Sequence, residues 1–158
     1  MRLRRPAVWL AGLILPAAAI AQSNLTSNLT SNPSNPPDID CSLGFEALRA
    51  AVQALPSAQT GEGSGFEVVM VSRPDVWRAE ISITTSWHPA YPAVTMRTFR
   101  KQVTGVWTAQ SKSCGYGDQS QFAALVEQMK AGDKSLTDAS RAAVDRAKAS
   151  KSPLAPPN

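Results

Sequence analysis

Residues 66–84 read F-E-V-V-M-V-S-R-P-D-V-W-R-A-E-I-S-I-T, and this stretch decides the expected fold. Its first part, Phe66 to Ser72, is rich in β-branched residues, and Arg73-Pro74-Asp75 places proline at a position that tight turns favour. From Val76 to Thr84, apolar and polar residues alternate, which is typical of a strand with one buried face. The residues expected on that buried face are Trp77, Ala79, Ile81 and Ile83. The stretch therefore predicts two strands joined by a tight turn.

Two further strands are expected, at Val94 to Phe99 and Val103 to Ser111, around a hairpin at Arg100-Lys101-Gln102. Short loops rather than helices join these consecutive strands, so the sheet should be antiparallel. The preceding segment, Ser57 to Gly65, reads S-A-Q-T-G-E-G-S-G. It lacks the lysine and the spacing of a phosphate-binding loop, and we expect it to be a glycine-rich connector. The sheet should therefore have about four strands.

A helix is expected before the sheet in the sequence, with Asp40 as its N-cap and Pro56 ending it. Its apolar residues recur at spacings of three and four, which is the pattern of an amphipathic helix. These residues are Leu43, Phe45, Leu48, Val52 and Leu55.

A second helix is expected after the sheet, because Asp118 and Gln121 have the spacing of a capping box. We expect Gly132 to end it, and a weaker third helix to follow from Ser135, with few apolar residues to hold it in place. The chain is thus expected to have an α+β fold. An N-terminal helix precedes an antiparallel sheet of about four strands, and one or more C-terminal helices cover one face of that sheet.

The N-terminus has the pattern of a secretory signal peptide. A basic start, M-R-L-R-R, precedes an apolar run from Ala7 to Ala19, and A-I-A then predicts cleavage after Ala21. The apolar run is shorter than the roughly 20 residues of a membrane span. We therefore expect a periplasmic or secreted protein with no stable membrane insertion once the signal is removed.

Five segments are expected along the chain. They are a signal peptide (1–21), a disordered linker rich in Asn, Ser, Thr and Pro (22–37), a single α+β domain (38–131), a marginal C-terminal helix (132–150) and a disordered tail (151–158). In the linker, Asn24 and Asn28 each begin an N-L-T pattern, which is glycosylated only in hosts with that machinery. The alternative is that these residues belong to a plain polar spacer.

The net charge changes when the signal peptide is removed. The whole chain carries +4, from 16 basic and 12 acidic residues. Three of the basic residues, Arg2, Arg4 and Arg5, lie in the signal peptide, which has no acidic residue, so the remainder carries +1. Such a small charge argues against a nucleic-acid partner.

Cys41 and Cys114 are the two cysteines of the chain, and in an exported protein they are expected to form a disulfide. Closing a loop of roughly 70 residues should stabilise the fold by about 4 kcal/mol. The alternative, Cys114 as a nucleophile activated by His88, is disfavoured because a reactive thiol would be oxidised outside the cytoplasm.

The most distinctive stretch is 86–92, S-W-H-P-A-Y-P, in which two prolines stiffen a loop between strands. Trp87 and Tyr91 offer flat faces on which a sugar ring or a partner's side chain could stack. Alternatively, these aromatic rings fold back and close the core. His88 is the single histidine of the chain, and we expect no zinc site because it has no second histidine at ligand spacing.

Basic residues gather near the last expected hairpin. Arg97, Arg100 and Lys101 are candidates, with the 86–92 loop, for contact with an anionic envelope polymer or a protein partner. Charges of this kind also protect an edge strand from pairing, which is the alternative interpretation.

These patterns favour a non-enzymatic binding or interaction module, with no cofactor. The expected binding residues are Trp87, His88, Tyr91, Arg97, Arg100 and Lys101. A second hypothesis is a small envelope hydrolase that uses Glu67, Glu80 or His88, because paired carboxylates carry out glycoside hydrolysis. A third is a structural envelope component that associates with itself through an exposed sheet edge.

Overall fold

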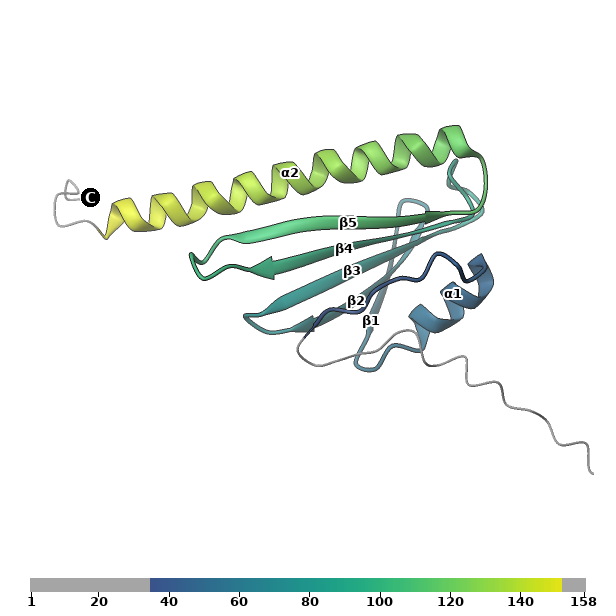
Figure 1. The fold of residues 1–158 in the computed structure, drawn as a ribbon, viewed down its shortest axis with the longest axis horizontal. Helices are drawn as coiled ribbons and strands as arrows, with labels where there is room; N and C mark the ends of the chain where they lie inside the picture. Colours follow the sequence, from purple (N-terminus) through teal and green to yellow (C-terminus); the bar gives the residue numbers. More distant parts are fainter. Residues whose placement is uncertain (1–34, 152–158) are drawn as a thin grey trace, which may run out of the picture.

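A computed structural model describes residues 35–151 (Figure 1). The expected signal peptide, its cleavage after Ala21 and the pattern at Asn24 and Asn28 lie outside the described residues. So do most of the expected linker and of the expected C-terminal tail.

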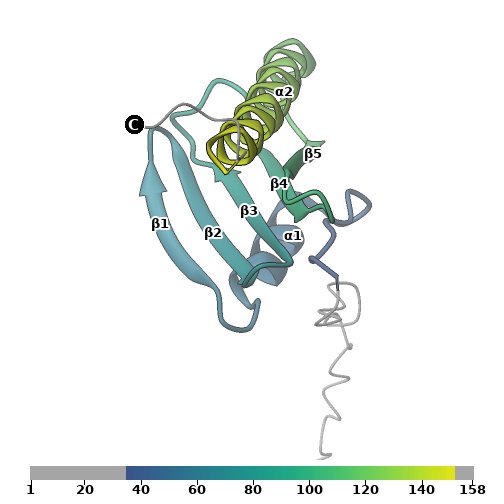
Figure 2. The same ribbon diagram turned by 90° about the vertical axis from the view of Figure 1, so that its left-hand side faces the viewer.

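The chain forms a five-stranded antiparallel sheet and two helices. The strands follow chain order across the sheet: β1 (Gln59–Gly63), β2 (Phe66–Arg73), β3 (Trp77–Thr84), β4 (Ala93–Lys101) and β5 (Trp107–Gly115). The helices are α1 (Phe45–Gln53) and α2 (Gln119–Ser150). Figures 1 and 2 show them on opposite sides of the sheet, with α2 running along β5. The expected α+β class and antiparallel sheet are confirmed.

The pairing register divides the side chains into two faces. The α1 face carries Val69, Ile81 and Met96, which are aligned across β2, β3 and β4. The α2 face carries Ala93 and Arg97, among others, so the helix on this side covers both apolar and charged residues. The main core lies between α1 and the α1 face, and its fully buried side chains include Ile39, Leu48, Val52, Val69, Ile81, Ile83 and Val94.

The alternation expected in β3 is confirmed, because Trp77, Ala79, Ile81 and Ile83 are all buried. The turn expected before it is also present. The Val76 N–H donates to the Arg73 carbonyl at 3.1 Å, and Asp75 has a positive φ of 61°.

Strand β1 was not expected, and the sheet has five strands instead of four. The Q-T-G-E-G sequence of β1 has no large apolar residue, and all five residues are exposed. It is held as an edge strand by backbone pairing with β2 across a two-residue turn, Ser64-Gly65, in which both φ angles are positive. Such turns suit the twist of a hairpin and favour glycine. The glycine-rich connector is therefore one strand of a hairpin.

Helix α1 begins at Phe45, so the expected N-cap at Asp40 was wrong. Gly44 occupies the cap position and provides no side-chain hydrogen bond. Asp40 instead accepts from the backbone N–H and the hydroxyl of Ser42, at 2.9 and 2.7 Å, and the Leu43 N–H donates to its carbonyl. Asp40 therefore builds a turn before the helix, a use of aspartate that competes with capping.

Helix α2 is continuous to Ser150 and does not end at Gly132. The expected cap is present, because Asp118 accepts from the N–H groups of Ser120 and Gln121, each at 2.9 Å. At Gly132, an added Cβ would lie 2.8 Å from Nη2 of Arg97. This glycine makes room for a guanidinium, and residues 132–150 continue the same helix.

Helix α2 also covers the sheet face opposite α1, whereas helices were expected on one face only. It closes the outer edge of β5. The N–H of Trp107 donates to Ser140 Oγ at 2.9 Å, and the N–H of Ala109 donates to Thr137 Oγ1 at 3.0 Å. Backbone donors that an edge strand leaves free are thus satisfied by helix hydroxyls, which removes the edge from strand pairing.

The last hairpin differs from the expected one by several residues. Val103 lies in the loop, and β5 begins at Trp107. The Gln102 N–H donates to the Val106 carbonyl at 2.8 Å, and Gly105 adopts a φ of 87°, a conformation that glycine permits.

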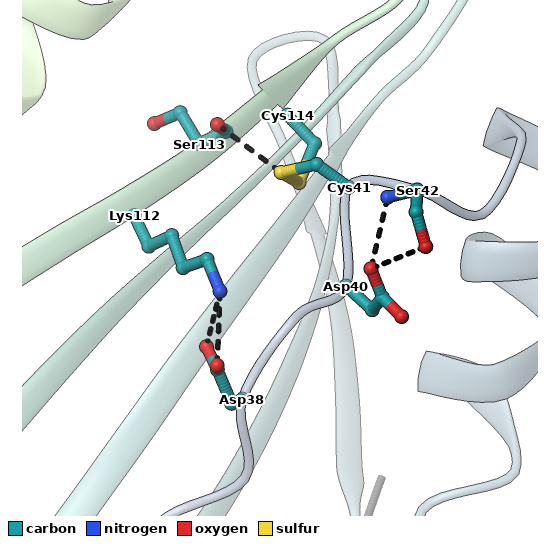
Figure 3. Close-up of polar contacts among 7 residues, drawn as sticks. All are labelled: Asp38, Asp40, Cys41, Ser42, Lys112, Ser113 and Cys114. Atoms are coloured by element: carbon teal, nitrogen blue, oxygen red, sulfur yellow. Dashed lines mark hydrogen bonds and ion pairs between the residues drawn. A yellow bond between two sulfur atoms is a disulfide. The ribbon is translucent and has the colours of Figure 1, made fainter. Parts of the chain in front are cut away.

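The expected disulfide between Cys41 and Cys114 is confirmed, with Cα atoms 5.2 Å apart (Figure 3). It joins the segment before α1 to the end of β5 and closes a loop with a sequence separation of 73. Within residues 35–151, neither helix is both long enough and apolar enough to cross a bilayer.

Candidate binding site

Loop 85–92 joins β3 to β4 at one end of the sheet, and backbone hydrogen bonds hold it. The Thr85 N–H donates to the Gly65 carbonyl at 2.9 Å, which fixes the loop to the β1–β2 turn. Within the loop, the His88 N–H donates to the Thr85 carbonyl at 3.0 Å, and the Tyr91 N–H donates to the His88 carbonyl at 2.9 Å. The loop is therefore built from successive turns.

The far end of the loop is fixed to the segment between β5 and α2. The Tyr116 N–H donates to the Pro92 carbonyl at 2.9 Å. Gly117 lies so close that an added Cβ would collide with the Tyr91 carbonyl oxygen and lie 2.8 Å from Pro92 Cδ. Ala90 is buried in a small apolar cluster with Leu125 of α2. The backbone of the loop is thus anchored on both sides.

Trp87 projects from this anchored backbone into water. Its side chain is 89% exposed, whereas Trp77 in the core is 8% exposed. A tryptophan usually buries most of its large apolar surface, because that surface is the main contribution of an indole to stability. Trp87 makes no such contribution, so the fold does not need this indole.

His88 holds the loop together from within. Its Nδ1 accepts a hydrogen bond from the Ala90 N–H at 3.1 Å, and its ring lies 4.5 Å from that of Phe66, centroid to centroid. Partial burial lowers the pKa of His88 below 6.5. Because Nδ1 accepts, the neutral ring carries its proton on Nε2. His88 therefore holds the turn that follows Trp87 in place.

Tyr91 is only partly available to a partner. Its side chain is 39% exposed, and its ring meets that of Phe45 edge to face at 5.4 Å. Of the two aromatic residues expected to stack on a ligand, Tyr91 also closes one end of the core, and Trp87 is free.

The structure separates the three basic candidates from the aromatic loop. Arg97 lies under α2, where its Nε donates to Asp133 Oδ1 at 2.8 Å, and both side chains are mostly buried. Arg100 and Lys101 lie at the end of β4 farthest from the loop, roughly 25 Å away at about 3.3 Å per residue. Lys101 pairs with Asp75 at 2.9 Å. The six candidates therefore do not form one surface.

The two carboxylates considered for hydrolysis lie on opposite faces of the sheet. Glu67 is on the α1 face, where it accepts from Arg49 at 3.1 Å and from Gln53 at 2.6 Å. Glu80 is on the α2 face, next to Arg97 in the pairing register. This pair cannot flank one substrate, as glycoside hydrolysis requires. Across residues 35–151, no group of three or more His, Cys, Asp or Glu residues is placed to hold a metal ion.

Two surface cavities of about 230 Å³ each were missed from the sequence. One lies between α2 and the sheet and is mainly apolar, lined by Phe99, Trp107 and Leu136. The other is polar and lies on the α1 face beside Arg100. Alternation along β4 and β5 could have grouped the strand residues that line each cavity, but only with the correct hairpin register.

No family model matches the sequence, and no match was found among curated proteins or among solved structures.

Proposed function

We propose that the protein is a non-enzymatic binding module that acts outside the cytoplasm, with Trp87 as the centre of its contact surface. The single observation that supports this proposal is the 89% exposure of an indole on an anchored loop. Tryptophans that become buried at an interface are among the commonest binding hot spots, because they bring a large rigid surface at little entropic cost. An anchored backbone lowers that cost further.

The proposed location rests on two features. The Cys41–Cys114 disulfide is compatible with a periplasmic or extracellular compartment, where such bonds persist. The N-terminal sequence has the pattern of a cleavable signal. The partner would then be an envelope polymer or an exported protein.

The experiment compares retention of the wild-type protein on the insoluble envelope fraction of its own organism with that of Trp87→Ala. A matched control is Val103→Ala, which also removes an exposed apolar side chain, but from the hairpin loop near the other end of β4. We expect Trp87→Ala to bind roughly thirtyfold more weakly, as for a hot spot of about 2 kcal/mol, and Val103→Ala to bind normally.

Thermal unfolding of both variants serves as the control for folding. Because Trp87 is exposed, its removal should leave the melting temperature unchanged. Equal retention of Trp87→Ala and wild type would contradict the proposal, and so would a large loss of stability in Trp87→Ala.

One observation favours a second candidate, a structural component that associates with itself. Strand β1 is fully exposed and pairs on one side only, with β2. Light scattering across a range of concentrations would detect this association. A monomer at all concentrations would argue against it.

A further inference from the structure

The polar cavity on the α1 face lies where α1 no longer covers the sheet. Its floor includes Met96 and Thr98 of β4, and one wall is the segment 36–38 that leads to the disulfide. Figure 3 shows this segment beside β5, with Asp38 facing Lys112. The cavity is distinct from the Trp87 loop, because it lies toward the other end of β4.

The sheet brings hydrogen-bond donors together in this cavity. Thr98 and Arg100 alternate along β4, so both lie on the α1 face, and Gln110 of β5 is directly opposite Thr98. Side chains that are opposite in an antiparallel pair have Cβ atoms about 5 Å apart, and diagonal neighbours remain within reach of long side chains. A hydroxyl, an amide and a guanidinium can therefore approach one bound group.

The charge of the cavity is positive. Lys112 Nζ lies 2.9 Å from both carboxylate oxygens of Asp38, so the lining carboxylate is already neutralised. Arg100 is exposed, and no residue of 35–151 forms an ion pair with it. One positive charge is thus left without compensation.

The wall formed by residues 36–38 is held in place before any ligand arrives. Ile39, the next residue, is fully buried in the core, and Cys41 is linked to Cys114. Together with the Asp38–Lys112 pair, these contacts hold the C-terminal end of the segment. Pre-formed sites bind without an ordering cost.

We propose that this cavity binds a small anionic group, a carboxylate or a phosphate, with Arg100 as its main ligand. Arginine matches the planar oxygens of these groups with two parallel hydrogen bonds. The volume of about 230 Å³ is below that of typical sites for drug-sized ligands, so it suits a single terminal group. The group is either a free anion or the end of a larger molecule, such as the terminal carboxylate of a peptide.

The test is an NMR titration of the full disulfide-bonded chain at constant ionic strength. Three probes are used: inorganic phosphate, the dipeptide acetyl-Ala-Ala with a free carboxylate, and the same dipeptide as its C-terminal amide. The variant is Arg100→Gln. Its matched control is Arg146→Gln, which removes an exposed positive charge from α2, on the opposite side of the sheet.

We expect saturable shifts at Thr98 and at the backbone and side-chain amides of Gln110, from phosphate, the free dipeptide acid or both. The dissociation constant should rise at least tenfold in Arg100→Gln and stay unchanged in Arg146→Gln. Binding of phosphate alone would identify a phosphate group, and binding of the dipeptide acid but not of its amide would identify a carboxylate. Gln110→Ala provides a second variant, with the same direction of change.

Three results would overturn the proposal. The first is the absence of saturable shifts with either anion. The second is equal affinity of Arg100→Gln and wild type for the anion that binds. The third is saturable binding of the dipeptide amide with the same affinity as the acid. None of these results depends on Trp87, so this site and the proposed contact loop stand or fall separately.

Discussion

Replacing Cys41 by serine and Cys114 by alanine removes the covalent link between the segment before α1 and the end of β5. Cys41 is exposed, so a hydroxyl is tolerated there, whereas Cys114 is 2% exposed and calls for an apolar replacement. The double variant should fold to the same sheet, because the core residues around the link are unchanged.

The size of the effect follows from the loop that the disulfide closes. With a sequence separation of 73, the chain-entropy estimate is about 4 kcal/mol at 25 °C. Domains of this size have free energies of unfolding of roughly 5–15 kcal/mol, so the variant should lose a large fraction of its stability.

Urea unfolding, followed by far-UV circular dichroism at 25 °C, measures this difference. We expect a lower midpoint and also a larger m-value, because an unfolded chain without the link exposes more surface. Chemically reduced wild type is the control and should behave as the double variant does. A loss below about 1 kcal/mol with an unchanged m-value would refute the reasoning, because the unfolded chain would then be compact without the link.

Two further predictions concern the loop that carries Trp87. Gly117→Ala should destabilise the fold by about 2 kcal/mol, because the new Cβ would collide with the backbone of Tyr91. Thermal unfolding measures this loss of stability. The control is Gly61→Ala, because an added Cβ at Gly61 meets nothing within 4 Å. Burial lowers the pKa of His88 below the 6.5 of the unfolded chain. As the pH falls below 6.5, the unfolded state therefore binds more protons than the folded state, and the free energy of unfolding decreases. Urea unfolding between pH 5 and 7.5 should show this slope in wild type and a flatter one in His88→Gln; equal slopes would contradict the assignment.

The elements that the sequence predicted well are those in which burial leaves a pattern. In β3, alternation identified the buried face, since each of its apolar residues has a partner in the core. Strand β1 left no such pattern because its residues are exposed, and backbone pairing alone holds it. Gly132 was expected to end a helix, but it is a glycine because the guanidinium of Arg97 packs against it. Arg97 lies on a strand distant in the sequence, so no local pattern indicates this contact.

The candidate site was predicted only in part, for a similar reason. The stiff aromatic loop is local, so its sequence indicated it directly. Nearness in sequence then wrongly grouped that loop with Arg100 and Lys101, although β4 carries those residues to the other end of the sheet. The polar cavity joins residues 36–38 to two strands some 60–75 positions later, and no sequence pattern links these segments.

The two edges of the sheet are unequal, and this limits what can grow from it. Hydroxyls of α2 occupy two outward donors of β5, at Trp107 and Ala109, and the helix runs along this strand, whereas β1 pairs on one side only. A head-to-tail fibre needs two complementary edges on every subunit, but here one edge is already blocked. Strand addition at β1 can therefore join two copies about a twofold axis, after which neither copy has an edge left to recruit a third.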